Sequence, residues 1–292
     1  HGLRPRHPLP RPGEGMATLP LVRGRERRSK LSIYTLGIDV GSTASKCIIL
    51  KDGTEIVGKS LIDVGAGTSG PARAIEAAFA SCQMTATDMA YTLATGYGRN
   101  SLDNIADSQM SELSCHARGA SFLFPDVRTV IDIGGQDVKA LHIENGSMVN
   151  FQMNDKCAAG TGRFLDVMAK VLEVDVNDLG DLGAQSTKRI AISSTCTVFA
   201  ESEVISQLSM GTDKRDIING IHHSVANRVV GLVNRIGVQD RVVMTGGVAQ
   251  NKGIVSALEE GLGHTVCTSP LTQYNGALGA ALFAYQKALK KK

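Results

Sequence analysis

The sequence predicts an α/β protein made of two similar domains with a cleft between them, chiefly because it contains an internal repeat. Asp, Gly and Lys recur at the same offsets in residues 38–46 and 131–139, which lie 93 positions apart. Short β-type runs flank each copy: 34–38, 47–50 and 55–58 in the first half, and 127–131, 140–143 and 148–152 in the second. Asp-Gly and Asn-Gly pairs separate the later runs, as is typical of hairpins. Both halves therefore begin as a three-stranded meander with a glycine-bearing first turn.

Helical patterns follow both meanders. The predicted helices are 70–82, 162–172, 199–208, 217–236 and 276–289, and a short strand is predicted at 242–244. The first of these helices is rich in Ala and opens with Pro71, a residue favoured in a first turn. We expect domain I at 32–127 and domain II at 128–269, with a closing helix within 270–289 that packs back on domain I.

Composition excludes several classes of protein. Hydrophobic residues make up 42% and charged residues 20% of the 292, a balance typical of globular proteins. Aromatic residues are 4% and Trp is absent, which gives little support to a base-stacking surface. The apolar stretches are too short to span a membrane. We therefore expect neither a nucleic-acid partner nor a membrane.

The basic charge of the chain is concentrated in its first segment. Residues 1–30 hold eight Lys/Arg and two Asp/Glu. The other 262 residues therefore hold 23 Lys/Arg (31 − 8) and 26 Asp/Glu (28 − 2), a slight acidic excess. This segment is rich in Arg, Pro and Gly and lacks the apolar centre of a secretory signal. We interpret 1–31 as a disordered leader introduced by cloning. The missing export signal predicts a cytoplasmic location.

The first turn of the repeat has the composition of a phosphate-binding loop. Gly41 lacks the Cβ that would block a close approach of the backbone. The backbone N–H groups of 41–44 and the hydroxyls of Ser42, Thr43 and Ser45 can then reach phosphate oxygens. The chain has no GxxxxGK[ST] sequence, so it is not a P-loop ATPase.

Charged residues frame both turns of the repeat. Asp39 and Asp132 end the two strands, and we expect them to face each other across the cleft and to hold Mg²⁺ through water. Lys46 is placed to neutralise phosphate charge. One such turn is weak evidence for nucleotide binding, because glycine-rich turns after strands are common. Two copies at a domain-sized spacing are much stronger evidence.

Two of the six cysteines differ from the rest. Cys157 and Cys196 lie in small, polar loops just before predicted helices, where free N–H groups favour a thiolate or an anionic cluster. A [4Fe–4S] cluster usually takes four thiolates, so two per chain would require a two-fold axis. The residues alone leave two interpretations open, ordinary buried thiols or cluster ligands. Cys47, Cys82, Cys115 and Cys267 are predicted core residues, and His222 and His223 predicted surface residues.

Four elements together resemble the phosphate 1, phosphate 2, adenosine and connect motifs of the acetate and sugar kinase, heat-shock chaperone and actin superfamily. The third is 244–251, which contains Thr245-Gly246-Gly247, and the fourth is 273–281. The resemblance implies an actin-like ATPase fold of two duplicated ribonuclease H-like domains, with ATP or ADP in the cleft. The nucleotide-binding residues that we expect are Gly41, Ser42, Thr43, Ala44, Ser45, Lys46, Gly134, Gly135, Gln136, Gly246, Gly247, Gln250, Asn251 and Gln273.

The second turn departs from the superfamily pattern at one position. Gln136 stands where a threonine is usual, and its amide can orient the attacking water but cannot act as a general base. We predict Gln136, Asp39 and Asp132 as the catalytic residues. This set favours slow, regulated hydrolysis over efficient phosphoryl transfer.

The cysteine-bearing segments carry a narrower resemblance. Residues 154–166 (NDKCAAGTGRFLD) and 193–208 (SSTCTVFAESEVISQL) are similar to the cluster segments of 2-hydroxyacyl-CoA dehydratase activators, ATPases of the BadF/BadG/BcrA/BcrD type. The resemblance implies a homodimer in which Cys157 and Cys196 of both chains hold one [4Fe–4S] cluster. Ferredoxin or flavodoxin would supply the electron, and a dehydratase, with (R)-2-hydroxyglutaryl-CoA as its expected substrate, would receive it. We expect ATP to reorient the two helices, to expose the cluster and to lower its potential.

Two other functions compete with this interpretation. A sugar or N-acetylhexosamine kinase of the same superfamily would need a base, for which Asp137 and Asp155 are available. The cysteine-bearing loops have no purpose in such a kinase. A chaperone-like or filament-forming ATPase is the third candidate, but no added peptide-binding domain is evident in the sequence.

Overall fold

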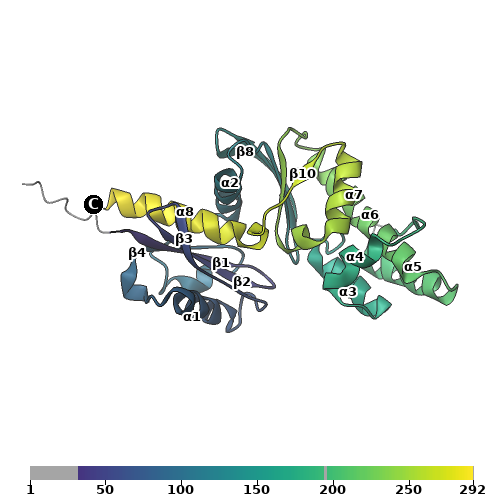
Figure 1. Ribbon diagram of the computed structural model, residues 1–292, viewed down its shortest axis with the longest axis horizontal. Helices are drawn as coiled ribbons and strands as arrows, with labels where there is room; N and C mark the ends of the chain where they lie inside the picture. The colour runs from purple at the N-terminus through teal and green to yellow at the C-terminus, as the bar shows by residue number, and fades with distance from the viewer. Residues whose placement is uncertain (1–31, 194–195, 292) are drawn as a thin grey trace, which may run out of the picture. The chain divides into compact units, whose positions relative to one another are not determined.

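The computed structural model describes residues 32–193 and 196–291, so the predicted leader at 1–31 lies outside the described residues. Two five-stranded mixed sheets carry the fold (Figure 1). Their strand orders are β3-β2-β1-β4-β5 and β8-β7-β6-β9-β10. The two orders are equivalent strand for strand, so the duplication predicted from the internal repeat is confirmed.

The first sheet lies between two helices. Its strands are β1 (Tyr34–Val40), β2 (Ser45–Lys51), β3 (Glu55–Ile62), β4 (Met89–Thr95) and β5 (Ser108–Gln109). Helix α1 (Gly70–Cys82) covers one face and α8 (Asn275–Lys290) the other (Figure 1). Successive residues of β2 serve opposite faces, because Cys47 and Ile49 join the core under α1 while Ile48 and Leu50 join the core under α8.

The second sheet also has a helical layer on each face. Its strands are β6 (Thr129–Ile133), β7 (Val138–Glu144), β8 (Ser147–Asn154), β9 (Val242–Thr245) and β10 (Val266–Cys267). On one face Val130, Leu141 and Val243 pack against α2 (Glu112–Leu123). Helix α2 also contacts α8, so it connects the two sheets.

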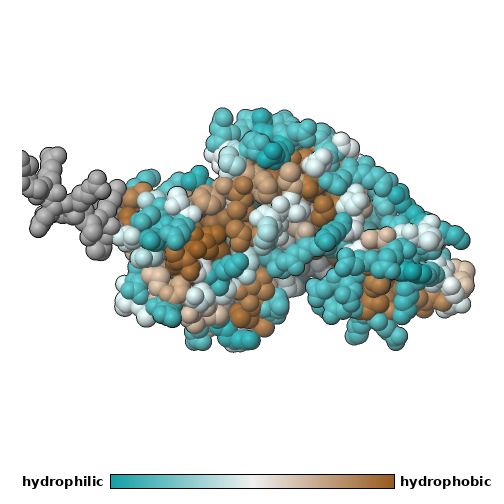
Figure 2. Space-filling model, viewed as in Figure 1, coloured by the Kyte–Doolittle hydropathy of each residue, from teal (hydrophilic) through white to brown (hydrophobic). Residues whose placement is uncertain are grey.

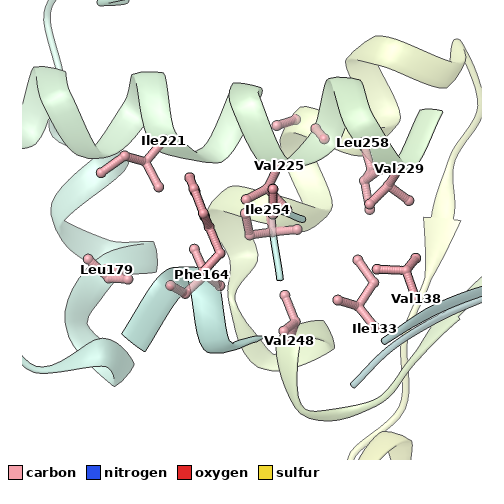
Figure 3. Packing of buried hydrophobic residues seen from close by; sticks show 14 of the residues in the cluster. Ile133, Val138, Phe164, Leu179, Ile221, Val225, Val229, Val248, Ile254 and Leu258 are labelled. Atoms are coloured by element: carbon pink, nitrogen blue, oxygen red, sulfur yellow. The ribbon is translucent and has the colours of Figure 1, made fainter. Parts of the chain in front are cut away.

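The largest apolar core covers the other face of the second sheet. The remaining elements are α3 (Gly162–Leu172), α4 (Leu179–Gly183), α5 (Thr197–Ser209), α6 (Lys214–Val233), α7 (Lys252–Leu262) and the 3₁₀ segments η1 (Ala86–Asp88), η2 (Arg99–Leu102), η3 (Val176–Asp178), η4 (Gly247–Gln250) and η5 (Thr272–Tyr274). Phe164 points from α3 toward Ile221 and Val225 of α6 (Figure 3). Fully burying a side chain of this kind contributes about 1.5–3 kcal/mol, so this cluster fixes α3 firmly on α6.

Most predicted elements are confirmed, and two details are corrected. Helix α6 begins at Lys214 rather than at 217, because the Asp213 side chain accepts a hydrogen bond from the Arg215 N–H and caps the helix there. His222, predicted at the surface, is only 2% exposed, since α6 is covered by α4 and α7. Within the described residues, no helix is long and apolar enough to cross a membrane. The domain boundaries at 127/128 and 269/270 stay predictions.

Candidate nucleotide and metal site

The first turn of the repeat closes tightly at the mouth of a cleft of about 920 Å³. The Gly41 N–H donates to the carbonyl of Ala44 at 3.0 Å, and the register of β1 with β2 places Asp39 opposite Lys46. The Lys46 Nζ lies 3.9 Å from Oδ2 of Asp39. Six of the predicted residues of this turn line the cleft: Asp39, Gly41, Ser42, Thr43, Ala44 and Lys46.

Ser45 is the one predicted nucleotide-binding residue that does not line the cleft. It is fully buried, and its hydroxyl donates to the carbonyl of Val64 at 2.9 Å. This bond fixes the start of β2 to the segment after β3. The phosphate contact of Ser45 stays a prediction.

The second turn repeats the geometry of the first. The Gly134 N–H donates to the carbonyl of Asp137 at 3.0 Å, and Asp132 lies opposite Lys139. The predicted residues Asp132, Gly134, Gly135 and Gln136 all line the cleft. The Asp-Gly-Lys repeat of the sequence therefore corresponds to two equivalent hairpins that face one cleft.

A buried lysine organises the charges beside the second turn. Lys139 is 3% exposed, and its Nζ lies 2.7 Å from Oδ2 of Asp137, 3.4 Å from Oδ2 of Asp132 and 3.8 Å from Oε1 of Glu112. Burial opposes the charge of this lysine, but the three carboxylates outweigh burial and raise its pKa. Burial raises the pKa of Glu112. One cation thus compensates a buried carboxylate, Asp132, and two half-buried ones, Asp137 and Glu112.

Asp132 stays ionised although it is buried. Burial alone would raise its pKa, but the charges of His116 and Lys139 and a hydrogen bond from Thr245 lower it to about 2. The Thr245 hydroxyl donates to Oδ1 at 2.8 Å, His116 Nδ1 lies 3.3 Å from the same oxygen, and Lys139 lies near Oδ2. A carboxylate has about four lone-pair sites, so one site on Oδ2 stays available to a water molecule. Together with Asp39 it fits a Mg²⁺ ion bound through water.

The third and fourth motifs form the far side of the cleft. Gly246 has a φ of +88°, and a side chain there would collide with the carbonyl of Ile133. Gln250 Nε2 donates to Oε1 of Gln273 at 2.7 Å. The Asn251 side chain caps α7 by accepting from the Ile254 N–H at 3.1 Å. These predicted residues line the cleft, as does Gly247.

The phosphate 2 turn is bonded directly to helix α3. The N–H of Gly162 donates to the carbonyl of Gly134, and the N–H of Arg163 donates to the carbonyl of Gly135, both at 2.9 Å. The first N–H groups of a helix have no partner inside that helix, so the turn supplies what α3 lacks. A displacement of this turn therefore displaces the start of α3.

Both predicted cluster cysteines lie next to helix starts, and neither lines the cleft. Cys157 precedes α3 by a short loop, in which its carbonyl accepts from Asn154 Nδ2 at 2.9 Å. Cys196 is the N-cap residue directly before α5, and α3 packs against α5. Both thiols are free and half-buried. No three His, Cys, Asp or Glu side chains meet as a metal site within residues 32–193 and 196–291.

The sequence of this chain matches a known family of proteins. The model of the BadF/BadG/BcrA/BcrD ATPase family matches residues 36–284. The chain belongs to this family of ATPases. It is 75% identical over 260 residues to the (R)-2-hydroxyglutaryl-CoA dehydratase activating ATPase of Acidaminococcus fermentans, covering 89% of this chain and 100% of that protein. It is 55% identical over 260 residues to the activator of lactoyl-CoA dehydratase of Anaerotignum propionicum, with coverages of 89% and 100%.

Solved structures agree with the family membership. The crystal structure of the Acidaminococcus fermentans (R)-2-hydroxyglutaryl-CoA dehydratase component A matches at 76% identity with a TM-score of 0.87, over 88% of this chain and all of that one. The 2-hydroxyisocaproyl-CoA dehydratase activator from Clostridium difficile, with bound ADPNP, matches at 54% identity with a TM-score of 0.87. The match covers 89% of this chain and 97% of that one. A glucokinase from Streptomyces griseus shares the fold alone. It is 14% identical with a TM-score of 0.56, over 87% of this chain and 99% of that one. The actin-like ATPase fold predicted from the motifs is confirmed.

The cleft residues that the sequence analysis missed include Glu112 and His116. Both line the cleft from the first two turns of α2. Neither belongs to the repeat, and α2 has no counterpart motif that would mark it. The sequence marked Lys139 only as the lysine of the repeat, and did not predict its contacts with three carboxylates.

Proposed function

We propose that this chain is an ATP-dependent activator that passes an electron to a 2-hydroxyacyl-CoA dehydratase. One observation carries the proposal: the phosphate 2 turn is hydrogen-bonded to the first two residues of α3, and α3 begins just after Cys157. Nucleotide chemistry in the cleft is thereby connected to the loop that would hold a cluster. The relatives that are named as activators of hydroxyglutaryl-CoA, hydroxyisocaproyl-CoA and lactoyl-CoA dehydratases support the choice of partner.

Within the cleft, each predicted residue takes a role in this proposal. The backbone N–H groups of both turns bind the phosphates, and Lys46 neutralises their charge. Asp39 and Asp132 hold the water shell of Mg²⁺, and Gln136 orients the attacking water. Gly246 and Gly247 leave room for the adenosine. Closure of the cleft on ATP then moves the Gly134–Gln136 turn and, through its two hydrogen bonds, α3.

We propose Cys157 and Cys196 as the ligands of a [4Fe–4S] cluster, which stores the electron. Each thiol lies at a loop before a helix, where free N–H groups favour negative charge. Because one chain supplies two thiolates, a homodimer would supply four. We take ferredoxin or flavodoxin as the donor, and (R)-2-hydroxyglutaryl-CoA as the substrate of the partner dehydratase.

The exposed side of α5 supports an interface at this place. Val198 is 64% exposed, Phe199 62% and Ile205 49%, although all three are apolar. In the region where α3 and α5 lie, Figure 2 shows apolar atoms at the surface among hydrophilic ones. Apolar side chains that follow a predicted cluster ligand fit a surface that a second chain covers.

Anaerobic iron and sulfide analysis with electron paramagnetic resonance tests the proposal. We expect about two iron atoms per chain, half of a shared four-iron cluster, in a dimeric wild-type protein. Cys157→Ser and Cys196→Ser should each lose iron and dimer, whereas Cys267→Ser, a half-buried thiol on β10, serves as the matched control. An iron-free monomer, or a cluster that survives both substitutions, would refute the redox proposal. A colourless protein that phosphorylates a sugar would instead identify the kinase.

A further inference from the structure

His116 lies buried at the floor of the cleft, where α2, α8 and β6 meet. It is 8% exposed, and its Nδ1 lies 3.3 Å from Oδ1 of Asp132. The same nitrogen lies 3.2 Å from Nδ2 of Asn275, the first residue of α8. His116 therefore stands between the carboxylate that ends a strand of the second sheet and the helix that covers the first sheet.

Asn275 holds His116 from two sides. It is fully buried, and its Nδ2 donates to the carbonyl of His116 at 2.9 Å in addition to facing the ring. The other atom of this amide, Oδ1, has no hydrogen-bond partner within the described part of the chain. His116 Nδ1 can donate to Asp132 only when it carries a proton, so in that state Asn275 acts through its hydrogen bond to the His116 carbonyl, which fixes the backbone that carries the ring.

The backbone of α8 lies against one side of the His116 ring. A Cβ added to Gly276 would lie 2.7 Å from Oδ2 of Asp39 and 3.2 Å from Nε2 of His116. The histidine ring and the first aspartate thus both abut the backbone of α8 at this glycine. Asp39 and Asp132 are consequently positioned with reference to the same short stretch of α8.

Asp132 receives directional contacts from three elements. Thr245 at the end of β9 donates to Oδ1, Lys139 on β7 lies near Oδ2, and His116 approaches Oδ1 from α2. Without His116, the attraction of Lys139 would act on the carboxylate with only Thr245 to oppose it. The carboxylate would then turn toward the lysine, and its free lone pair would no longer face the cleft.

We propose that His116 and Asn275 are positioning residues that hold Asp132 in the orientation needed to bind the water shell of Mg²⁺, and that they fix this orientation relative to α8. The inference rests on the proposed nucleotide chemistry of the cleft. ATP and ADP themselves are bound by the backbone of the two turns, which neither residue touches. The pair therefore affects the metal and the hydrolysis step, and leaves the binding of metal-free nucleotide unchanged.

The test compares four variants of the anaerobically purified protein. His116→Ala removes the ring, His116→Asn can place an amide nitrogen where Nδ1 lies, and Asn275→Ala removes the amide. His264→Asn is a control at a partly exposed histidine outside the cleft. Calorimetric titration with ADP, with and without Mg²⁺, gives the affinity for the metal complex apart from that for the nucleotide. ATP turnover is measured separately from the KM for ATP.

We expect His116→Ala to lose roughly tenfold or more in Mg²⁺-dependent ADP affinity and in turnover, as is typical when an outer-shell partner is removed. His116→Asn should recover most of both, and Asn275→Ala should show the same pattern in weaker form. The affinity for ADP in the presence of a chelator should stay within a factor of two or so of the wild-type value in all variants.

Two results would overturn the inference. The first is an unchanged Mg²⁺ dependence in His116→Ala. The second is an equal loss of ADP affinity with and without Mg²⁺ that His116→Asn fails to restore, since this pattern indicates a structural role.

A failure of the proposed function shows itself differently, because the wild-type protein would then bind no Mg·ADP and hydrolyse no ATP. A wild type that binds Mg·ADP but lacks a cluster would overturn the redox proposal and leave the role of His116 intact.

Discussion

The N–H of Gly162, the first residue of α3, donates to the carbonyl of Gly134 in the phosphate 2 turn at 2.9 Å. This bond joins the nucleotide cleft to the helix that follows Cys157. The residue before it, Thr161, is extended, with a φ of −113° and a ψ of 173°. A proline at position 162 would therefore fit both the first position of the helix and the residue before it.

We predict that Gly162→Pro uncouples the cleft from α3. The substitution removes one N–H and turns the ring Cδ toward the Gly134 carbonyl, which must move away, while proline itself suits the first position of the helix. ATP turnover should fall by roughly fivefold, in keeping with the loss of a single hydrogen bond of about 1 kcal/mol. The change in the cluster signal on exchanging ADP for ATP, followed by electron paramagnetic resonance, should be reduced or lost. Gly162→Ala adds a similar Cβ and keeps the N–H, so it should retain that change. A full ATP response in the proline variant would contradict this coupling.

We predict that protonation of His222 destabilises the protein in mild acid. Burial, together with the charge of His223, lowers the pKa of His222 from 6.5 to about 4. Between these values the unfolded chain binds a proton that the folded chain does not, so the free energy of unfolding falls as the pH drops from about 6.5 to about 4, by up to roughly 3 kcal/mol. Nε2 of His222 also lies 3.3 Å from Nδ2 of Asn251, a contact that requires an unprotonated nitrogen.

Denaturation curves measured from pH 7 to pH 4.5 check this effect. His222→Gln keeps an acceptor near the place of Nε2 but cannot titrate, so its stability should depend less steeply on pH than that of the wild type. His223→Gln should keep most of the wild-type slope, because burial of His222 is the larger cause. Parallel curves for wild type and His222→Gln would show that another group dominates.

We predict that Gly246→Ala damages both stability and ADP binding. The added Cβ would collide with the carbonyl of Ile133, and the φ of +88° is unfavourable for alanine. We expect a loss of at least about 3 kcal/mol in the free energy of unfolding, combining backbone strain with a steric shift at the cleft. Gly263→Ala is the matched control, because its φ is +69° but a Cβ there would meet open space. It should cost about 1 kcal/mol and leave ADP binding intact. Equal losses in the two variants would rule out the steric cause.

We predict that Lys139→Met destabilises the fold by about 3–5 kcal/mol, because it leaves three acids near one another without their buried cation. Adding Asp137→Asn to this variant should recover part of the loss, since Asp137 makes the closest of the three contacts at 2.7 Å. Calorimetric unfolding of both single variants and the double variant gives the coupling energy. Purely additive losses would mean that Lys139 and Asp137 do not stabilise each other.

The sequence was sufficient for the parts of the fold that repeat. The spacing of Asp39 and Asp132 predicted two equivalent hairpins, because a two-fold recurrence of strand, glycine turn and strand is visible locally. The sequence was not sufficient for residues that reach the cleft from elsewhere. His116 and Asn275 are 159 residues apart, and their contact depends on how α2 crosses α8. No local periodicity encodes such a crossing.

The burial of His222 was missed for a related reason. Its neighbours on α6 alternate between apolar and polar residues in a way that also suits a half-exposed helix. The helix is covered on several sides by α4, α5 and α7, and this follows only from the tertiary packing. Propensity and pattern locate a helix, but the number of its buried faces is decided by elements far away in the chain.

The place of α8 has a consequence for how the protein is made. Strands β1 to β5 leave the ribosome early, yet the face that contains Ile48, Leu50 and Leu93 is covered by α8, which is synthesised only after the whole second sheet. That apolar face stays bare throughout the intervening translation. Nascent chains halted before residue 275 should therefore aggregate or recruit chaperones, and a separate α8 peptide should rescue them.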